Sequence, residues 1–182
     1  MLHRRAIVVV AVALSAVLIV ASAAGAHVTV QPGSAAKGSF SIFSFSVPNE
    51  EADANTVKLE VTFPVKNPIP FVSVQPMPGW TISTEKAKLD KPVKTDDGEI
   101  TEAVTKVTWT ATAGGLNPGE FDLFTVSAGP LPTNTKQLAF PTLQTYSSGE
   151  VVRWIQTTAK GAPEPDFPVP TLTLTKASSG HH

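Results

Sequence analysis

The sequence predicts an all-β protein, an antiparallel β-sandwich, from three observations. Apolar residues recur with a period of two from His27 onward, most clearly in Val57–Phe63 and Val107–Ala111, where they alternate with polar residues. No window after residue 26 shows the 3.6-residue apolar stripe of a helix. In addition, Pro and Gly punctuate these segments at turn sequences such as Pro48-Asn49 and Asn117-Pro118-Gly119. Many short strands with regular turns favour a sandwich.

Each predicted strand is an apolar-alternating or β-branched segment bounded by turn residues. In chain order they are Val28–Gln31, Ser39–Val47, Val57–Phe63, Val72–Gln75, Thr81–Thr84, Val107–Ala111, Phe121–Ser127, Gln137–Phe140, Val151–Gln156 and Leu172–Thr175. The apolar face of the second strand switches at Ile42-Phe43, which predicts a bulge or twist. The four prolines in Gly161–Pro170 indicate an extended connection to the last strand. We therefore expect an immunoglobulin- or cupredoxin-like sandwich.

The first 26 residues have the order of a secretory signal peptide: two arginines, an apolar segment and small residues. Cleavage after the triplet Ala24-Gly25-Ala26 would make His27 the new N-terminus. Two alternatives are cleavage after Ala23 and an uncleaved anchor over Ala6–Ala26. We predict a signal peptide at 1–26, a single domain at 27–176 and a flexible tail or tag remnant at 177–182. Such a protein works outside the cytoplasm, either secreted, periplasmic or on the cell surface.

The composition excludes several kinds of chemistry. The chain has no Cys, so a disulfide framework, a thiolate nucleophile, an iron–sulfur cluster and a Cys-ligated metal site are all excluded. Its 14 basic and 15 acidic residues form no basic tract, which argues against a nucleic-acid partner. His27 is the one histidine between the leader and the tail. A Ser-His-Asp triad or a multi-histidine zinc site cannot be built from one imidazole.

A histidine at a free N-terminus offers a metal two nitrogen donors, Nδ1 and the α-amine, in one short chelate ring. Among divalent first-row metals, such nitrogen donors favour Cu(II). The α-amine has a reference pKa of about 7.7–8.0, so protons compete with the metal near neutral pH. The predicted strand Val28–Gln31 would hold the chelating end against the sheet. The residue pattern therefore predicts a copper site at His27, although a first-position His also arises by chance.

The remaining donors must be oxygen atoms, and Glu120 has the best local context. It follows the turn Asn117-Pro118-Gly119 and opens the aromatic strand Phe121–Phe124. A carboxylate at a strand entrance can be fixed by its neighbours, although an ordinary solvated turn residue would look the same. Asp122 lies two residues further on the same predicted face and is the reserve candidate.

With these residues in view, the chain resembles the YcnI-like family of extracytoplasmic copper-binding proteins. The stretches that carry the resemblance are His27–Val30, Pro78–Trp80, Val107–Ala111, Pro118–Asp122 and Gln144–Trp154. The resemblance implies a β-sandwich that holds one Cu(II) ion in a mono-histidine brace, with the amine and imidazole of His27, the carboxylate of Glu120, and Trp154 against the metal. Relatives often carry an acidic residue where Leu123 stands, and commonly a C-terminal membrane helix, so a membrane tether beyond residue 182 is also an expectation.

Trp154 has a physical reason to lie beside a metal. An indole face shields the ion from water and interacts favourably with its positive charge, and such neighbours tune redox potential. The alternative is that Trp154 fills the sandwich core beside Val152. Trp80 and Trp109 are expected to point inward, and Tyr146 and Met77 are expected to be packing residues.

The sequence thus predicts a non-enzymatic, exported Cu(II)-binding protein that acts in copper trafficking or homeostasis. A copper transporter or another copper chaperone would be its partner. Copper oxygenases that act on polysaccharides also begin with histidine but need a second one, which this domain lacks. The other alternative is a metal-free exported sandwich that serves in adhesion or interaction.

Overall fold

The computed structural model describes residues 27–95, 98–159 and 161–176. The predicted signal peptide and the tail at 177–182 lie outside these residues. The described part of the chain is built from strands and turns, and no helix in it is long and apolar enough to cross a membrane. The strands are β1 (Thr29–Gln31), β2 (Ser34–Ala36), β3 (Ser41–Pro48), β4 (Thr56–Thr62), β5 (Phe71–Val74), β6 (Trp80–Thr95), β7 (Gly98–Ala111), β8 (Phe121–Gly129), β9 (Gln137–Ala139), β10 (Thr142–Tyr146), β11 (Val151–Trp154) and β12 (Thr171–Thr175).

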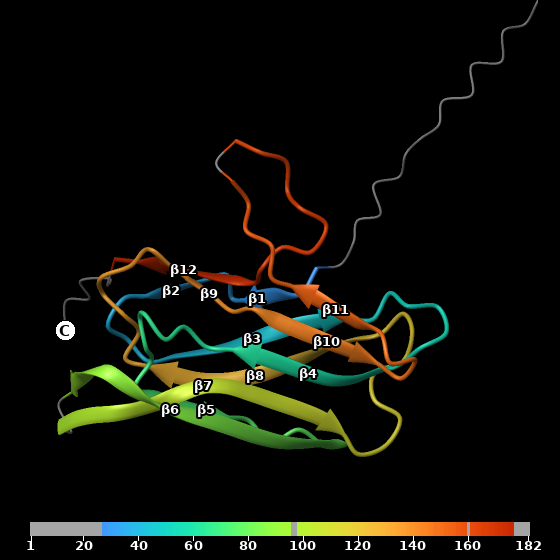
Figure 1. Cartoon of the computed structure of the whole chain (residues 1–182), viewed down its shortest axis with the longest axis horizontal. Helices are drawn as coiled ribbons and strands as arrows, with labels where there is room; N and C mark the ends of the chain where they lie inside the picture. Colours follow the sequence, from blue (N-terminus) through green and yellow to red (C-terminus); the bar gives the residue numbers. More distant parts are fainter. Residues whose placement is uncertain (1–26, 96–97, 160, 177–182) are drawn as a thin grey trace, which may run out of the picture.

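The strands form two main sheets and one small one (Figure 1). The β3 sheet has the order β1-β3-β8-β5, and the β4 sheet has the order β11-β10-β4-β7-β6. The small sheet, β2-β12-β9, contains the parallel pair β2–β12, whereas the pairs of the two main sheets are antiparallel. The all-β antiparallel sandwich is confirmed.

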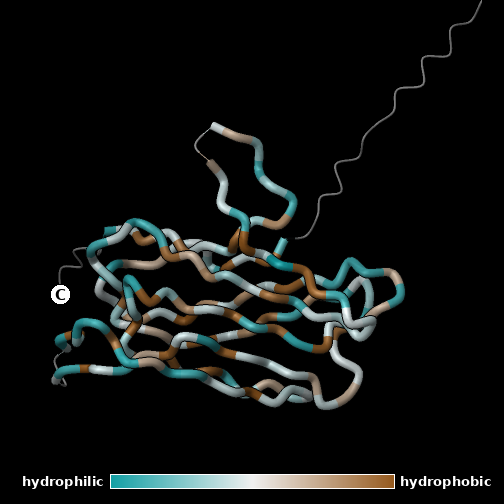
Figure 2. Tube along the Cα trace, viewed as in Figure 1, coloured by the Kyte–Doolittle hydropathy of each residue, from teal (hydrophilic) through white to brown (hydrophobic). Residues whose placement is uncertain are grey.

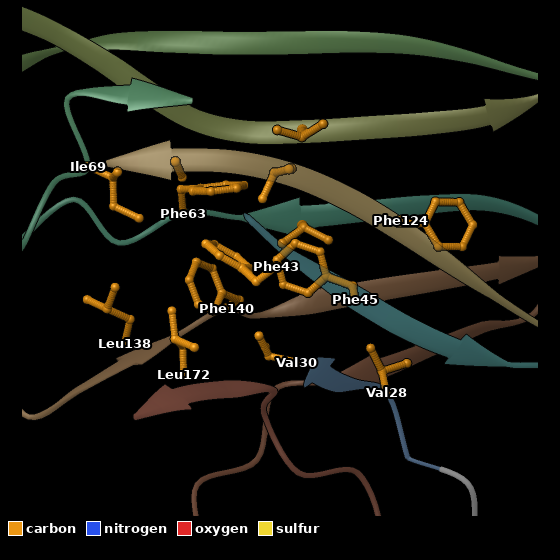
Figure 3. Packing of buried hydrophobic residues seen from close by; sticks show 14 of the residues in the cluster. Val28, Val30, Phe43, Phe45, Phe63, Ile69, Phe124, Leu138, Phe140 and Leu172 are labelled. Carbon is orange, nitrogen blue, oxygen red and sulfur yellow. The ribbon is translucent and has the colours of Figure 1, made fainter. Parts of the chain in front are cut away.

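The core lies where the inner faces of the sheets meet, and aromatic rings occupy its centre. Phe45 contacts Trp109 of the opposite sheet with ring centroids 6.4 Å apart, and Phe124 contacts the same indole at 5.5 Å. Figure 3 shows the rings of Phe43, Phe45 and Phe140 packed together. Along the strands hydrophobic and hydrophilic residues alternate (Figure 2), as expected for strands with one face buried. Burial of these apolar side chains holds the layers together.

The structure excludes the bulge that was one of the two explanations predicted for β3. The register between β3 and β8 runs without a shift from Ser41 to Pro48, so no bulge occurs at Ile42-Phe43. Phe43 points into the core, and Ile42 is 68% exposed on the outer face. The apparent switch of the apolar face arises because an exposed isoleucine stands at a position where a polar residue was expected.

Three further features differ from the sequence expectation. The three-residue strand β2 was not predicted. The segments near Thr81 and Val107 belong to one long hairpin, β6–β7, whose strands extend well beyond the predicted bounds. β10 was not predicted, because its inward positions are Thr142, Gln144 and Tyr146, and two of these are polar. Trp109 and Tyr146 are buried, as predicted for packing residues.

Strand pairing brings three chain segments to one end of the β3 sheet. β1 pairs with β3 so that Thr29 faces Ser46, and Pro48 at the end of β3 faces Phe121 at the start of β8. His27 lies two residues before β1, and Glu120 lies directly before β8. The topology therefore places both predicted metal ligands at the same end of the sandwich.

The turn before Glu120 depends on Gly115. Thr56 and Leu116 exchange two backbone hydrogen bonds, of 2.9 and 3.0 Å, and this close approach brings the backbone of Thr56 against Gly115. Gly115 has a φ of 77°, and an added Cβ would overlap the carbonyl oxygen of Thr56. Both the conformation and the lack of space require glycine here.

We expect Gly115→Ala to destabilise the domain by about 1–3 kcal/mol through backbone strain, and further through the overlap with Thr56. Urea unfolding followed by tryptophan fluorescence measures the change. Gly33→Ala is the matched control, since a Cβ there would lie at an ordinary 3.8 Å from the carbonyl oxygen of Val30. Equal stability of the two variants would contradict this interpretation of Gly115.

Candidate metal centre

The predicted ligands His27 and Glu120 line the same surface hollow, which has a volume of about 920 Å³. Its wall combines the segment before β1, the end of β3 with the following loop, and the turn before β8. The lining residues are His27, Thr29, Ser46, Pro48, Asn49, Glu50, Glu51, Ala52, Pro118, Gly119, Glu120 and Phe121. Two carboxylates that the sequence analysis did not single out, Glu50 and Glu51, thus accompany Glu120. Three acidic side chains make the hollow attractive to a cation.

His27 is held in place by the residues that follow it. Val28 and Val30 are 1% and 3% exposed and anchor this segment in the core, while Thr29 pairs with Ser46. The imidazole of His27 keeps 27% of its side-chain surface accessible. It is therefore fixed by its neighbours yet open to an incoming ion.

The indole of Trp154 contacts this imidazole edge-on, with ring centroids 5.8 Å apart. Trp154 is 6% exposed and belongs to the hydrophobic core. The indole therefore belongs to the core, as the alternative interpretation of this residue predicts, and one side of it lies against His27.

Gln144 fixes the orientation of that indole. Its buried side-chain oxygen accepts a hydrogen bond of 3.0 Å from Nε1 of Trp154. Its amide nitrogen donates to the carbonyl oxygen of Pro48 and to Oγ1 of Thr56, both at 2.8 Å. One side chain therefore ties Trp154 to the end of β3, where the hollow begins.

Glu120 is exposed, and Asn117 holds its carboxylate. Oε2 of Glu120 accepts hydrogen bonds from the side-chain amide of Asn117 at 3.0 Å and from its backbone N–H at 2.9 Å. These two bonds, the side-chain one first, keep the pKa of Glu120 below its ordinary value. The carboxylate is therefore ionised at neutral pH, which is the form that binds a metal.

Asn49 joins the two loops that face each other across the hollow, and it is 1% exposed. Its side-chain nitrogen donates to the carbonyls of Ala54 and Leu116, at 2.8 and 2.9 Å. Its backbone accepts a hydrogen bond from Gly119 and donates one to the carbonyl of Glu120, both at 2.8 Å. The sequence predicted Pro48-Asn49 only as a turn, and this joining role of Asn49 was not predicted.

The reserve candidate Asp122 is not among the residues that line the hollow. Its Oδ1 accepts a hydrogen bond of 2.7 Å from the backbone N–H of Leu123. A different carboxylate, Glu164, has its Oε1 3.6 Å from Nδ1 of His27, and the sequence analysis did not predict this approach. Within the described ranges, no three or more His, Asp or Glu side chains form a group that could hold a metal by themselves.

Comparisons with known proteins give three findings. The family described as "Domain of unknown function (DUF1775)" matches residues 27–174. Copper-binding protein CutI of Bacillus subtilis (strain 168) is 29% identical over 177 residues, which are 97% of this chain and 76% of the relative. A crystal structure of an uncharacterized protein from Nocardia farcinica, described as an immunoglobulin-like fold, is 40% identical, with a TM-score of 0.66 over 82% of this chain and 99% of that one. The immunoglobulin-like character of the sandwich is thereby confirmed.

We expect Gln144→Met to destabilise the domain by about 1–3 kcal/mol, because the buried Nε1 of Trp154 would lose its acceptor while the side-chain volume stays nearly constant. Chemical unfolding gives the free energy, and the emission of Trp154 reports its changed surroundings. Gln137→Met on exposed β9 is the control. A loss of stability no larger than in the control would show that the hydrogen bond to Gln144 is dispensable.

Proposed function

Because the chain belongs to the DUF1775 family, also known as the YcnI family, we propose that it is an exported protein that binds one Cu(II) ion in a mono-histidine brace at its mature N-terminus and serves copper trafficking or homeostasis. His27 would supply its imidazole and its α-amine, and Glu120 would supply a carboxylate. Export with cleavage before His27 is part of the proposal, since the brace requires a free amine. The name of the Bacillus subtilis relative supports copper as the ligand.

The observation that carries the proposal is the meeting of His27 and Glu120 at one hollow. The two residues come from distant parts of the sequence, and the pairings β1–β3 and β3–β8 bring them to the same end of the sandwich. Nitrogen and oxygen donors without sulfur suit a divalent copper ion better than Cu(I), which prefers thiolate and thioether ligands. The donor set therefore fits Cu(II).

The fixed position of His27 supports a tight site. Because Val28 and Val30 are buried, the ordering of the chelating residue is achieved during folding and need not be achieved again on binding. Trp154 contributes a second advantage. Its ring contact covers one side of the imidazole, which restricts the access of water there.

The exposure of the hollow suits a protein that hands its metal on. Glu120 is at the surface, and Phe121 beside it is 65% exposed. A partner of the kind proposed, a copper transporter or a copper chaperone, could therefore reach the bound ion directly. The acidic side chains Glu50 and Glu51 would attract the ion to the hollow.

We expect a protein that retains Ala26 before His27 to lose tight Cu(II) binding, because the α-amine of His27 then becomes a peptide nitrogen. Titration with one equivalent of Cu(II), beside the protein that begins at His27, measures the difference. Circular dichroism of the two metal-free proteins controls for folding. Equal affinity would refute the brace.

Glu120→Gln should weaken Cu(II) binding roughly tenfold or more, the scale found even for residues that only support metal ligands. It should also change the Cu(II) electron paramagnetic resonance (EPR) spectrum, because a charged oxygen donor is lost. Glu102→Gln removes the same charge from an exposed position on β7 and should change neither. If the Glu120 variant kept the wild-type spectrum and affinity, Glu120 would not be a ligand, and another carboxylate would have to supply the oxygen donor.

A further inference from the structure

The connection between β11 and β12 brings Glu164 to the imidazole of His27. In Figure 1 this connection rises from the body of the sandwich close to the start of the described chain. Oε1 of Glu164 lies 3.6 Å from Nδ1 of His27, and the Glu164 side chain is 67% exposed. Nδ1 is the atom that would bind the metal in the proposed brace. A carboxylate thus stands beside the donor atom itself.

The base of the connection is anchored by hydrogen bonds close to Glu164 in the sequence. Gln156 and Phe167 bind each other twice: the backbone N–H of Gln156 donates to the carbonyl of Phe167 at 3.0 Å, and the N–H of Phe167 donates to Oε1 of Gln156 at 2.8 Å. The N–H of Val169 donates to the carbonyl of Gln156 at 2.8 Å. The connection is therefore fixed at Phe167, three residues beyond Glu164.

An aromatic contact joins the same base to the copper-site tryptophan. The ring of Phe167 meets the indole of Trp154 edge-on at 5.5 Å, and the other ring contact of this indole is His27, at 5.8 Å. Trp154 thus lies between the residue that begins the mature chain and the segment that carries Glu164. One buried side chain is therefore in contact with both of these parts of the chain.

The distance between the two donor atoms suits a shared metal better than a direct hydrogen bond. At 3.6 Å the nitrogen and oxygen are farther apart than in a good hydrogen bond, which measures about 2.7–3.2 Å. Imidazole and carboxylate ligands lie about 2.0–2.2 Å from a metal such as zinc, so two of them on one ion are roughly 3–4 Å apart. The separation of Nδ1 and Oε1 is thus within the range expected for two ligands of one divalent ion.

We propose that Glu164 is a further copper-binding residue, whose carboxylate binds the Cu(II) ion held by Nδ1 of His27. This inference rests on the proposed function. It adds a second anionic oxygen to the set formed by His27 and Glu120. Hard oxygen donors favour the divalent ion over Cu(I), so Glu164 makes the site more selective for Cu(II).

The test uses the mature protein that begins at His27, with CuCl₂ as the probe. Glu164→Gln should weaken Cu(II) binding roughly tenfold or more and should alter the hyperfine couplings in the Cu(II) EPR spectrum. Asp166→Asn is the matched control, because it removes the same charge from an exposed position of the same connection. The control should keep the wild-type spectrum and affinity.

Two outcomes would overturn the inference. If Glu164→Gln binds Cu(II) as tightly as wild type, or more tightly, with an unchanged spectrum, Glu164 only pairs with the imidazole of the metal-free protein. If Asp166→Asn weakens binding as much as Glu164→Gln, the effect is one of overall charge. If the wild-type protein binds one equivalent of Cu(II) while either of these outcomes is seen, the proposed function stands and only the role of Glu164 fails. Wild-type protein that binds no Cu(II) overturns both.

Discussion

The pairing of β1 with β3 is the constraint on which the candidate site depends. β1 is three residues long, and it stays in place because Val28 and Val30 are buried on one side of the chain while Thr29 and Gln31 remain outside. Burial of each valine contributes about 1.5–3 kcal/mol. If His27 is the N-terminus, as proposed, these anchors keep it from fraying, since terminal residues are poorly ordered unless they are tied down. The same alternation that buries Val28 keeps the imidazole of His27 accessible.

Two buried polar side chains, those of Gln144 and Asn49, fix the positions of the residues around His27 through hydrogen bonds. Gln144 orients Trp154 and ties it to Pro48, and Asn49 joins the loop after β3 to the turn before Glu120. Each of these amides is buried with both of its functions hydrogen-bonded. A buried network of this kind is specific, because a displaced loop would leave donors and acceptors without partners. The hollow thus has a defined shape although much of its rim is exposed.

The sequence predicted those features that depend on local pattern. Strands such as β4 and β8 were predicted because one face is apolar, and Glu120 was chosen as a candidate ligand because a turn precedes an aromatic strand. β10 was not predicted because its buried positions include two polar residues, Thr142 and Gln144. The side chain of Gln144 is held inward by long-range hydrogen bonds to Pro48 and Thr56, which a sequence pattern does not show. The approach of Glu164 to His27 was not predicted from the sequence for a related reason. The path of a proline-rich connection is decided by tertiary contacts, here those of Phe167 with Trp154, and periodicity carries no trace of them.

In the proposed site, His27 binds copper through two nitrogen atoms, its α-amine and Nδ1. Pulsed EPR of the Cu(II)-loaded mature protein tests this most directly, with histidine labelled by ¹⁵N at the α-nitrogen alone and with His181 and His182 replaced by alanine. We expect the label to change the nitrogen hyperfine pattern while the imidazole signal persists, since both nitrogens would then belong to His27. A copper spectrum that the α-label leaves unchanged would contradict the claim.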